Sequence, residues 1–276
     1  MDKKFLNEGP LGKNCGYISK YDKTLLFPIP REMQRKKLGI SEEETPFNGF
    51  DLLNSYELSW LNDKGKPLVT IGRFVLPAHS PALIESKSLK LYLNSLNNTR
   101  FSDLESVKEV IQKDLSEAAG AEVKVEIFEL EDYHISINSS LPGENLDSLD
   151  IEIDTYNVNS DLLSISDEIC DETLNSNLLK SNCLVTGQPD WGSVVIHYQG
   201  HKINRENLLK YIISFRSHNE FHEHCVERIF CDIMKQCRPN MLTVYAKYTR
   251  RGGLDINPLR TTETDLHPAY IRLVRQ

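Results

Sequence analysis

Strand-like and helix-like segments follow one another in the same order twice along this chain of 276 residues. Alternating apolar residues predict strands, and apolar residues three or four apart predict helices. The first half is expected to contain two strands (56–61 and 68–76), two helices (85–96 and 102–120) and two strands (123–127 and 133–138). The second half is expected to contain strands around Leu184 and Val194, helices from Asn204 and over 221–237, and strands over 242–248 and 254–259. This order indicates a duplicated α+β module, in which each antiparallel sheet carries two helices on one face.

The composition along the chain divides it into four expected segments. Residues 1–50 carry four prolines among short apolar groups and are expected to form an irregular N-terminal arm. The first module is expected over 51–140 and the second over 179–276. Between them, residues 141–178 hold many acidic side chains and neither lysine nor arginine, which is typical of a solvated acidic connection.

The overall charge limits the classes of partner. The formal net charge is -8, whereas a general nucleic-acid binder shows a basic face. We therefore expect no nucleic-acid partner. The six cysteines form no CxxC pair, and no apolar run approaches membrane-spanning length. These features predict a reduced, cytoplasmic protein without membrane contact.

The segment 181–194 predicts a strand, a tight turn and a second strand. Leu184 and Val185 are expected in the first strand. Cys183 and Asp190 would then lie at the same end of a hairpin, where a sulfur nucleophile and a proton donor share one site. Residue type alone also allows a buried core cysteine and a turn-forming aspartate.

Two cationic segments suit an anionic ligand. Lys87 and Lys90 share a helix face in the first turn, where the helix dipole disfavours cations. A bound anion would reverse that penalty and satisfy free backbone N–H groups. In the run 250–253 (RRGG), paired glycines let the backbone turn tightly beside a phosphate, and the arginines supply charge. A basic surface turn is the alternative at both places.

His222 and Glu223 lean toward the buried stripe of the helix expected over 221–237. A carboxylate on an apolar face needs hydrogen-bond donors, and a guanine-like base with paired N–H groups would supply them. The alternative is a solvated carboxylate in the first helical turn. A zinc site would draw on His222, His224, Cys225 and Cys183. The two histidines point about 200° apart on a helix, which disfavours such a site.

Together, these segments resemble the NADPH-dependent 7-cyano-7-deazaguanine reductases, the QueF family of nitrile reductases. The resemblance is carried by four runs spread over nearly the whole chain: Glu85 to Leu93 (ESKSLKLYL), Cys183 to Trp191 (CLVTGQPDW), Phe221 to Glu223 (FHE) and Tyr248 to Gly253 (YTRRGG). Their order is similar to that of the longer, two-module branch, with the cofactor motif in the first module and the nucleophile in the second. The resemblance implies two tandem tunnelling-fold modules, a homodimer and no metal.

The resemblance also implies a role for each matching residue. The reaction would be the NADPH-dependent reduction of the nitrile of 7-cyano-7-deazaguanine to an aminomethyl group, a step of queuosine biosynthesis. Cys183 would form a covalent thioimide with the substrate, and Asp190 would donate protons. The substrate-binding residues would be Ile84, Glu85, Ser86, His222 and Glu223. The cofactor-binding residues would be Ser86, Lys87, Arg251 and Gly252.

Three other classes of protein fit parts of the pattern. A hydrolase of the same tunnelling fold, similar to a GTP cyclohydrolase, would need metal ligands that the sequence does not assemble. A cysteine nitrile hydrolase would consume the nitrile without NADPH. A non-catalytic purine-binding module would keep every activity when Cys183 is replaced by alanine.

Overall fold

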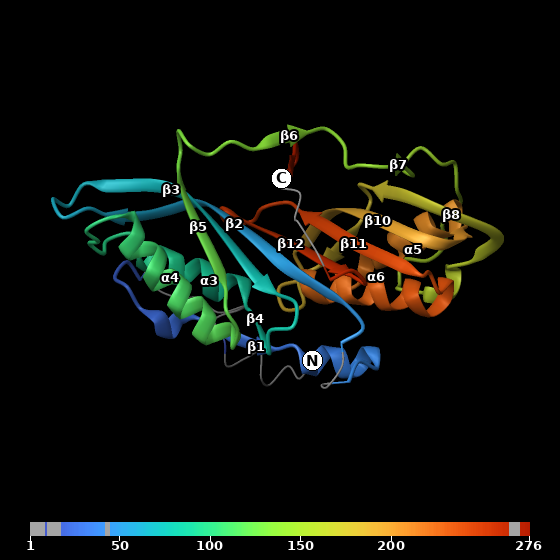
Figure 1. Cartoon of the computed structure of the whole chain (residues 1–276), viewed down its shortest axis with the longest axis horizontal. Helices are drawn as coiled ribbons and strands as arrows, with labels where there is room; N and C mark the ends of the chain where they lie inside the picture. The colour runs from blue at the N-terminus through green and yellow to red at the C-terminus, as the bar shows by residue number, and fades with distance from the viewer. Residues whose placement is uncertain (1–8, 10–17, 42–44, 265–270) are drawn as a thin grey trace. The chain divides into compact units, whose positions relative to one another are not determined.

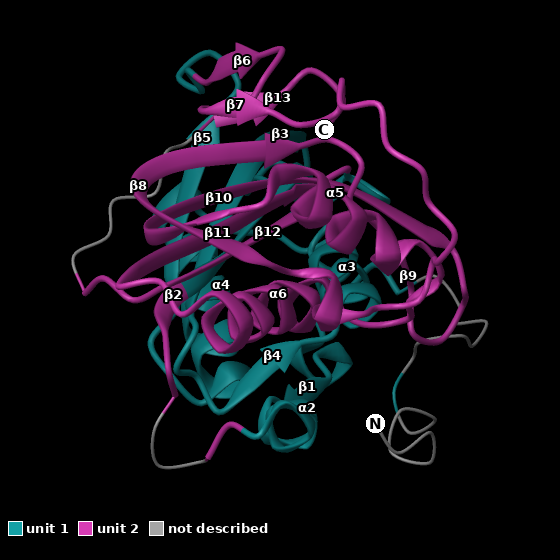
Figure 2. Cartoon of the chain, turned by 90° about the vertical axis from the view of Figure 1, so that its right-hand side faces the viewer, with its two compact units in different colours: residues 1–39, 50–134, 250–255 teal, residues 40–49, 135–249, 256–276 magenta. Residues whose placement is uncertain are grey.

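The computed structural model describes all residues except 1–8, 10–17, 42–44 and 265–270. The chain divides into two compact units (Figure 2). Unit 1 comprises residues 1–39, 50–134 and 250–255. Unit 2 comprises residues 40–49, 135–249 and 256–276. Parts of the expected N-terminal arm therefore lie outside the described residues.

The described part of the arm consists of short elements. These are η1 (Lys23–Leu25), β1 (Pro28–Pro30), α2 (Glu32–Arg35) and η2 (Lys36–Leu38). Strand β1 pairs antiparallel with β4 (Ala82–Ile84), and Glu85 N donates to Phe27 O at 3.0 Å. The arm is thus tied by backbone hydrogen bonds to the segment that leads into the cofactor motif.

The main strands of unit 1 pair antiparallel, in the order β5-β3-β2. Its strands are β2 (Asn48–Leu61), β3 (Pro67–Pro77) and β5 (Lys124–Glu129). The unit also contains helices α3 (Ser86–Ser95) and α4 (Leu104–Ala119), which lie beside each other (Figure 1). Leu89 of α3 and Ile111 of α4 are fully buried, as the helical spacing of apolar residues predicts.

The start of α4 differs from the prediction. Ser102 and Glu105 have the spacing of a capping box, but none forms, because Asp103 is the N-cap residue and its side chain accepts from Ser106 N at 2.8 Å. Aspartate is at least as good an N-cap as serine, and it lies one residue closer to the apolar stripe. The predicted end of the helix is confirmed, since Gly120 is the C-cap with φ 70°.

The main strands of unit 2 lie in the order β12-β11-β10-β8-β7. Its longer strands are β8 (Ile165–Ser176), β10 (Pro189–Ile203), β11 (Met241–Tyr248) and β12 (Leu254–Thr261), and these pair antiparallel. The short β7 (Glu144–Asn145) pairs parallel with β8. Helix α6 (His222–Cys237) packs against β10 and β11, and α5 (Arg205–Ser214) precedes it (Figure 1). The predicted α+β class with mainly antiparallel sheets is confirmed.

Further short elements belong to unit 2. They are β6 (Ser136–Asn138), η3 (Ser160–Leu162), β9 (Lys180–Asn182), η4 (Phe215–Ser217) and β13 (Ile271–Leu273). Strand β9 pairs with the start of β10, and β6 pairs parallel with β13. The strand expected over 133–138 is therefore shorter than predicted, and it pairs with the C-terminal segment.

The segment expected as an acidic connection contributes a long strand to unit 2. Residues 165–176 form β8, which pairs with most of β10. The first part of β8 is exposed, with Ile169 at 64% exposure, so the alternation that marks a half-buried strand is weak there. Strand β9 ends at Asn182. Leu184 and Val185 therefore lie in a turn, and their predicted place in a strand is wrong.

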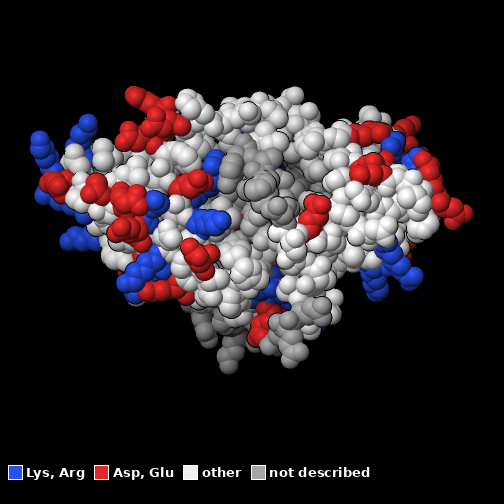
Figure 3. All heavy atoms as spheres, in the orientation of Figure 1, with Lys and Arg blue, Asp and Glu red and all other residues white. Residues whose placement is uncertain are grey.

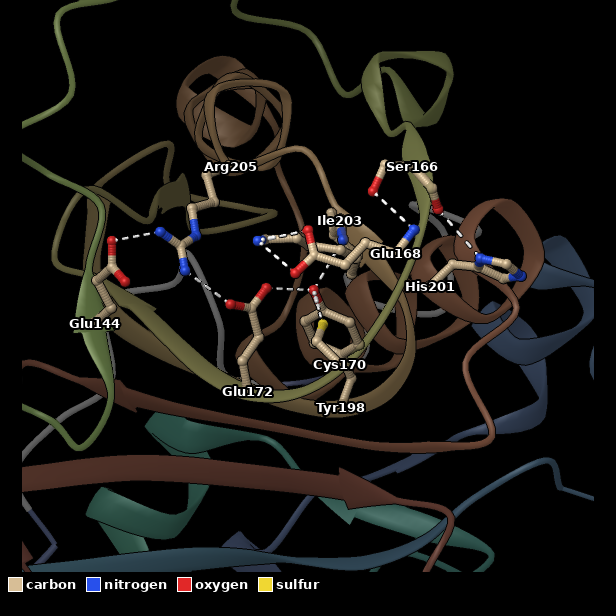
Figure 4. Close-up of polar contacts among 10 residues, drawn as sticks. Glu144, Ser166, Glu168, Cys170, Glu172, Tyr198, His201, Ile203 and Arg205 are labelled. Atoms are coloured by element: carbon tan, nitrogen blue, oxygen red, sulfur yellow. Dashed lines mark hydrogen bonds and ion pairs between the residues drawn. The ribbon is translucent and has the colours of Figure 1, made fainter.

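Cations of β10 and α5 pair with acidic side chains of that segment (Figure 4). Arg205 lies between Glu144 and Glu172, with one nitrogen 2.8 Å from each carboxylate. Lys202 Nζ lies 2.9 Å from Glu168 Oε2. Such partly exposed pairs each contribute less than about 1 kcal/mol. The acidic segment is therefore held to the sheet by several weak contacts in addition to its strand pairing.

Charges of both signs are mixed at the surface. On the face drawn in Figure 3, Lys and Arg side chains lie among Asp and Glu side chains. In the described parts of the chain, no helix combines the length and the apolar character needed to cross a membrane.

A buried ion pair connects α6 to β12 within unit 2. Arg260 Nε and Nη2 donate to Glu227 Oε1 at 3.1 and 3.0 Å, and both side chains are 0% exposed. The ring centroid of Phe47 lies 5.5 Å from Arg260 Cζ. Removing one partner of such a pair costs more than removing both, because the remaining charge stays buried.

Replacing Glu227 alone by leucine is expected to lower the free energy of unfolding by about 3–5 kcal/mol. The double variant Glu227→Leu/Arg260→Met is expected to lose less, because it removes both charges of the pair. Urea unfolding of wild type and both variants measures these values. A double variant that is less stable than the single variant would contradict this account of the pair.

Candidate active site

Cys183 lies at the end of the β9–β10 hairpin in unit 2. It directly follows β9, and its loop is closed by two hydrogen bonds: Cys183 N donates to Gln188 O (2.8 Å) and Gly187 N donates to Cys183 O (3.0 Å). Gly187 has φ 67°, a conformation that favours glycine. The cysteine is half-buried. The alternative of a fully buried core cysteine therefore does not hold.

The register of the hairpin places Asp190 at the same end. Asp190 lies opposite Ser181 of β9 and is 4% exposed. His222, the first residue of α6, approaches it, with Nε2 3.5 Å from Asp190 Oδ1. The structure thus brings together two predicted site residues that are far apart in the sequence. A carboxyl beside an imidazole at this distance is suited to proton exchange after a small adjustment.

The start of α6 buries Glu223. This residue is 4% exposed, so the alternative of a solvated carboxylate in the first turn does not hold. His224 is 1% exposed, and its ring lies against that of Phe221, with centroids 5.9 Å apart. Within the described residues, no group of three His, Cys, Asp or Glu side chains is arranged to hold a metal ion.

Sequence reasoning assigned no role to Tyr248, the last residue of β11. Its ring is fully buried and lies 4.1 Å from the His222 ring, centroid to centroid. Burial raises the pKa of Tyr248 well above its ordinary value, and the negative charges of Asp190 and Glu223 raise it further. The phenol therefore stays protonated. Alternation over 242–248 identifies a strand, but it does not distinguish the wall of a site from ordinary core.

A short segment before α6 runs beside β9 and fixes its end. Asn182 N donates to His218 O at 2.8 Å, and Glu220 N donates to Asn182 O at 3.2 Å. Asn219 Nδ2 donates to Cys183 O at 3.3 Å. The backbone that carries the thiol is therefore held from both sides of β9, by this segment and by β10.

Glu220 anchors that segment through a buried charge. Its carboxylate is 3% exposed and accepts from Arg228 Nε (3.1 Å) and Nη2 (3.0 Å), and it lies 2.9 Å from His218 Nε2. Burial alone raises the pKa of Glu220. The hydrogen bonds and charges of His218 and Arg228 outweigh burial and lower the pKa to about 2.

In unit 1, Glu85 is the N-cap of α3. Its carboxylate is 1% exposed and accepts from Lys87 N and Ser88 N, both at 2.8 Å. Burial raises the pKa of Glu85, and these hydrogen bonds oppose the increase. The expectation that an anion would satisfy free N–H groups at this helix terminus is therefore wrong for these two groups, because Glu85 occupies them.

Two predicted cofactor segments meet in unit 1. Arg251 N donates to Leu254 O at 2.9 Å, which closes a tight turn with Gly252 at φ 59°. A Cβ on Gly252 would lie 3.4 Å from Lys90 Cδ. The glycine turn therefore lies against the side chain of Lys90, and Lys87 is placed one helical turn before Lys90.

This arrangement fits the anionic part of a dinucleotide such as NADPH. Lys87, Lys90 and Arg251 bring positive charge to one region of unit 1, and the exposed Gly252 permits close approach to the backbone. Because Glu85 occupies backbone N–H groups of α3, side chains rather than the helix terminus would hold the phosphate groups.

The remaining predicted substrate residues are also in unit 1. Ile84 ends β4 and is 2% exposed, and Ser86 begins α3 with its hydroxyl 3.4 Å from Glu85 Oε1. His222 and Glu223 belong to unit 2. That Ile84 and Ser86 contact the same substrate molecule as His222 and Glu223 stays a prediction.

Two family models match the chain. The model described as nitrile reductase, 7-cyano-7-deazaguanine-reductase N-term, matches residues 17–127, and the model described as QueF-like protein matches residues 189–266. One solved structure, titled as the archaeosine synthase QueF-Like in the apo form, covers 36% of this chain and 99% of its own, with 16% identity and a TM-score of 0.31. That likeness is too low to carry an argument.

Curated relatives are similar over almost the entire chain. The NADPH-dependent 7-cyano-7-deazaguanine reductase of Hydrogenovibrio crunogenus is 57% identical over 267 residues, which is 96% of each chain. That of Legionella pneumophila (strain Corby) is 55% identical over 98% of this chain and 95% of the relative. That of Chromohalobacter salexigens is 53% identical over 99% and 98%.

The model that matches residues 17–127 describes a nitrile reductase, a class to which a hairpin thiol and a cationic region are suited. The chain belongs to the family of NADPH-dependent 7-cyano-7-deazaguanine reductases. The resemblance drawn from the sequence is confirmed.

Glu220→Gln is expected to lower the free energy of unfolding at neutral pH by about 3 kcal/mol, the equivalent of the change in pKa from 4.5 to about 2. Because the folded-state pKa is the lower one, this contribution is present above about pH 4.5 and is lost as the pH falls toward about 2. Urea unfolding from about pH 7 to about pH 3 should therefore show a shrinking difference between wild type and variant.

Glu168→Gln serves as the matched control, because Glu168 pairs with Lys202 at the surface and is 61% exposed. Its replacement should change the free energy of unfolding by less than about 1 kcal/mol at any pH. A Glu220→Gln difference that stays constant down to about pH 3 would show that the charge of Glu220 is not what stabilises the segment.

Proposed function

We propose that this protein reduces the nitrile of 7-cyano-7-deazaguanine to 7-aminomethyl-7-deazaguanine with NADPH, through a covalent thioimide on Cys183. Membership in the reductase family supports the reaction. The observation that supports the mechanism is the hairpin that places the half-buried Cys183 and the buried Asp190 at one end. The product is proposed to enter queuosine biosynthesis in the cytoplasm.

The first step adds the thiol to the nitrile. The sulfur of Cys183 forms a bond to the nitrile carbon, the C≡N triple bond becomes a double bond, and the nitrogen takes up one proton. The thiol loses one proton, so the addition is balanced and releases no atom. Asp190 is proposed to deliver the proton to the nitrogen, and His222, 3.5 Å from Asp190, is placed to exchange protons with it.

Two reductions then convert the thioimide into the amine. NADPH, when bound, supplies one hydride for each reduction. In the first, the substrate carbon accepts the hydride and the nitrogen a proton, after which the C–S bond breaks to give an imine and the free thiol. In the second, the imine carbon accepts a hydride and the nitrogen a proton. One nitrile therefore takes up two hydrides and two protons, which requires two NADPH.

His222 and Glu223 are proposed to bind the deazaguanine base. A carboxylate that is 4% exposed gains most from donors that a ligand brings in pairs, and a guanine-like edge presents such a pair. Ile84, Glu85 and Ser86 are proposed to contribute from unit 1. Since the carboxylate of Glu85 already caps α3, its contribution to substrate binding would use its remaining lone pairs.

Ser86, Lys87, Arg251 and Gly252 are proposed to contact NADPH, with Lys90 beside them. The contact between the Gly252 turn and the Lys90 side chain supports this grouping. We further propose that the two units, each with antiparallel strands and two longer helices, are tandem tunnelling-fold modules and that the protein forms a homodimer. The substrate is proposed to be the free base, without a nucleic-acid or membrane partner and without a metal.

Cys183→Ala is expected to reduce the rate of NADPH oxidation with 7-cyano-7-deazaguanine at least about a thousandfold, because the thioimide cannot form. Wild type should oxidise two NADPH per nitrile, followed by absorbance. Without NADPH, intact-mass measurement should show wild type, and not the variant, gaining the mass of the nitrile.

Cys170→Ala is the matched control, since Cys170 is also a half-buried thiol of unit 2. It should keep the rate within about twofold of wild type. Consumption of the nitrile without NADPH would instead favour a nitrile hydrolase. An unaltered rate in Cys183→Ala would refute the covalent mechanism.

Lys87→Ala and Arg251→Ala are each expected to raise KM for NADPH about tenfold, through the loss of one cation–phosphate contact. KM for the nitrile should change less than about twofold. Lys64→Ala, in an exposed turn of unit 1, is the control and should leave both constants unchanged. If KM for NADPH is the same in all four proteins, the phosphate groups are held elsewhere.

A further inference from the structure

Two strands of unit 2 place an aromatic ring beside the Asp190–His222 pair. Tyr248 on β11 lies opposite Gly192 on β10. A Cβ at Gly192 would lie 3.1 Å from Tyr248 Cε1, so the absence of a side chain there lets the ring lie across β10. The same ring lies 4.1 Å from the ring of His222. Tyr248 therefore supports the imidazole that approaches Asp190.

The side chain of Gln276 is hydrogen-bonded to β11 and to the neighbouring β12. Its Nε2 donates to Tyr248 O at 3.2 Å and to Asn257 Oδ1 at 2.7 Å. Its Oε1 accepts from Leu273 N at 3.0 Å, and the residue is 5% exposed. A buried amide with partners for both ends holds one geometry, because leaving any of these groups unpaired is costly.

Arg275 holds Gly192, the residue of β10 that lies opposite Tyr248. One guanidinium nitrogen, Nη2, donates to Gly192 O at 2.5 Å, to Ser193 Oγ at 2.8 Å and to Asn177 O at 2.7 Å. Arg275 and Gln276 therefore hold Gly192 and Tyr248 respectively, two residues that face each other next to Asp190.

We propose that Arg275 and Gln276 are positioning residues for the reduction: they fix the Gly192–Tyr248 pair, so that the Tyr248 ring keeps His222 beside Asp190. Neither residue touches the reacting atoms. This inference rests on the proposed function and extends the machinery of that site to the C-terminal segment 271–276.

The ring of Tyr248, rather than its hydroxyl, provides the support, since the ring makes the contact with His222 and the buried hydroxyl has no hydrogen-bond partner among the described residues. Tyr248→Phe keeps the ring and is expected to retain kcat within about twofold. Tyr248→Leu removes the ring and is expected to lower kcat at least about tenfold, because small displacements of reacting groups are costly. If Tyr248 had only a structural role, Tyr248→Phe and Tyr248→Leu would have the same kcat when both proteins are fully folded.

The closing experiment measures kcat and KM for 7-cyano-7-deazaguanine at saturating NADPH, at a temperature where circular dichroism shows every variant fully folded. Gln276→Ala is expected to lower kcat about tenfold while KM for the nitrile stays within about twofold. Gln276→Glu should show a similar loss, because a carboxylate cannot donate to Tyr248 O. Val274→Ser, in the same tail and 65% exposed, should match wild type.

Unchanged kcat in Gln276→Ala and Gln276→Glu, with an active wild type, would overturn this inference and leave the proposed function intact, and so would unchanged kcat in Tyr248→Leu. An equal loss in Val274→Ser would also overturn it, because the effect would then belong to the tail as a whole. A wild type that oxidises no NADPH in the presence of the nitrile would overturn the proposed function and the inference with it. If Gln276→Ala does not fold, Gln276→Glu, which keeps the size of the side chain but cannot donate to Tyr248 O, decides the matter.

Discussion

The register of strand β10 determines which residues of unit 2 lie opposite Asp190 and Gly192. Pairing with β9 sets Asp190 opposite Ser181 and close to Cys183, and pairing with β11 sets Gly192 opposite Tyr248. A slip of one residue would turn each of these side chains to the other face of the sheet. Apolar residues farther along β10 are buried in the core and resist such a slip. The precision of the site thus derives from ordinary core packing several residues away.

Periodicity predicted most helices and strands because their apolar faces are buried. Helices α3, α5 and α6, and strands β3, β5 and β11, lie close to their expected places. The failures occur where burial is incomplete or where two residues of similar type compete. Strand β8 is exposed over its first half and therefore lacks the alternating pattern. Asp103, rather than Ser102, caps α4, a choice that spacing alone does not decide.

The candidate site was predictable only in part, because residue type does not reveal what a buried charge contacts. Glu85, Glu220 and Glu227 are each at most 3% exposed. In the structure, the first caps a helix, the second holds the segment beside β9, and the third neutralises an arginine in the core. Motif resemblance identified Glu85 but neither of the others. The contacts of the C-terminal residues with β10 and β11 join distant parts of the chain, and no local pattern encodes them.

The turn at 250–255 has a consequence for the order of events during synthesis. These six residues belong to unit 1, although the strands before and after the turn lie largely in unit 2. Asp255 accepts hydrogen bonds from Asn54 and Tyr56, and Gly253 O accepts from Tyr56 N. A growing chain that has left the ribosome only as far as the end of β5 therefore lacks part of unit 1. The N-terminal unit is completed only after most of unit 2 has been translated, which links the folding of the two units in time.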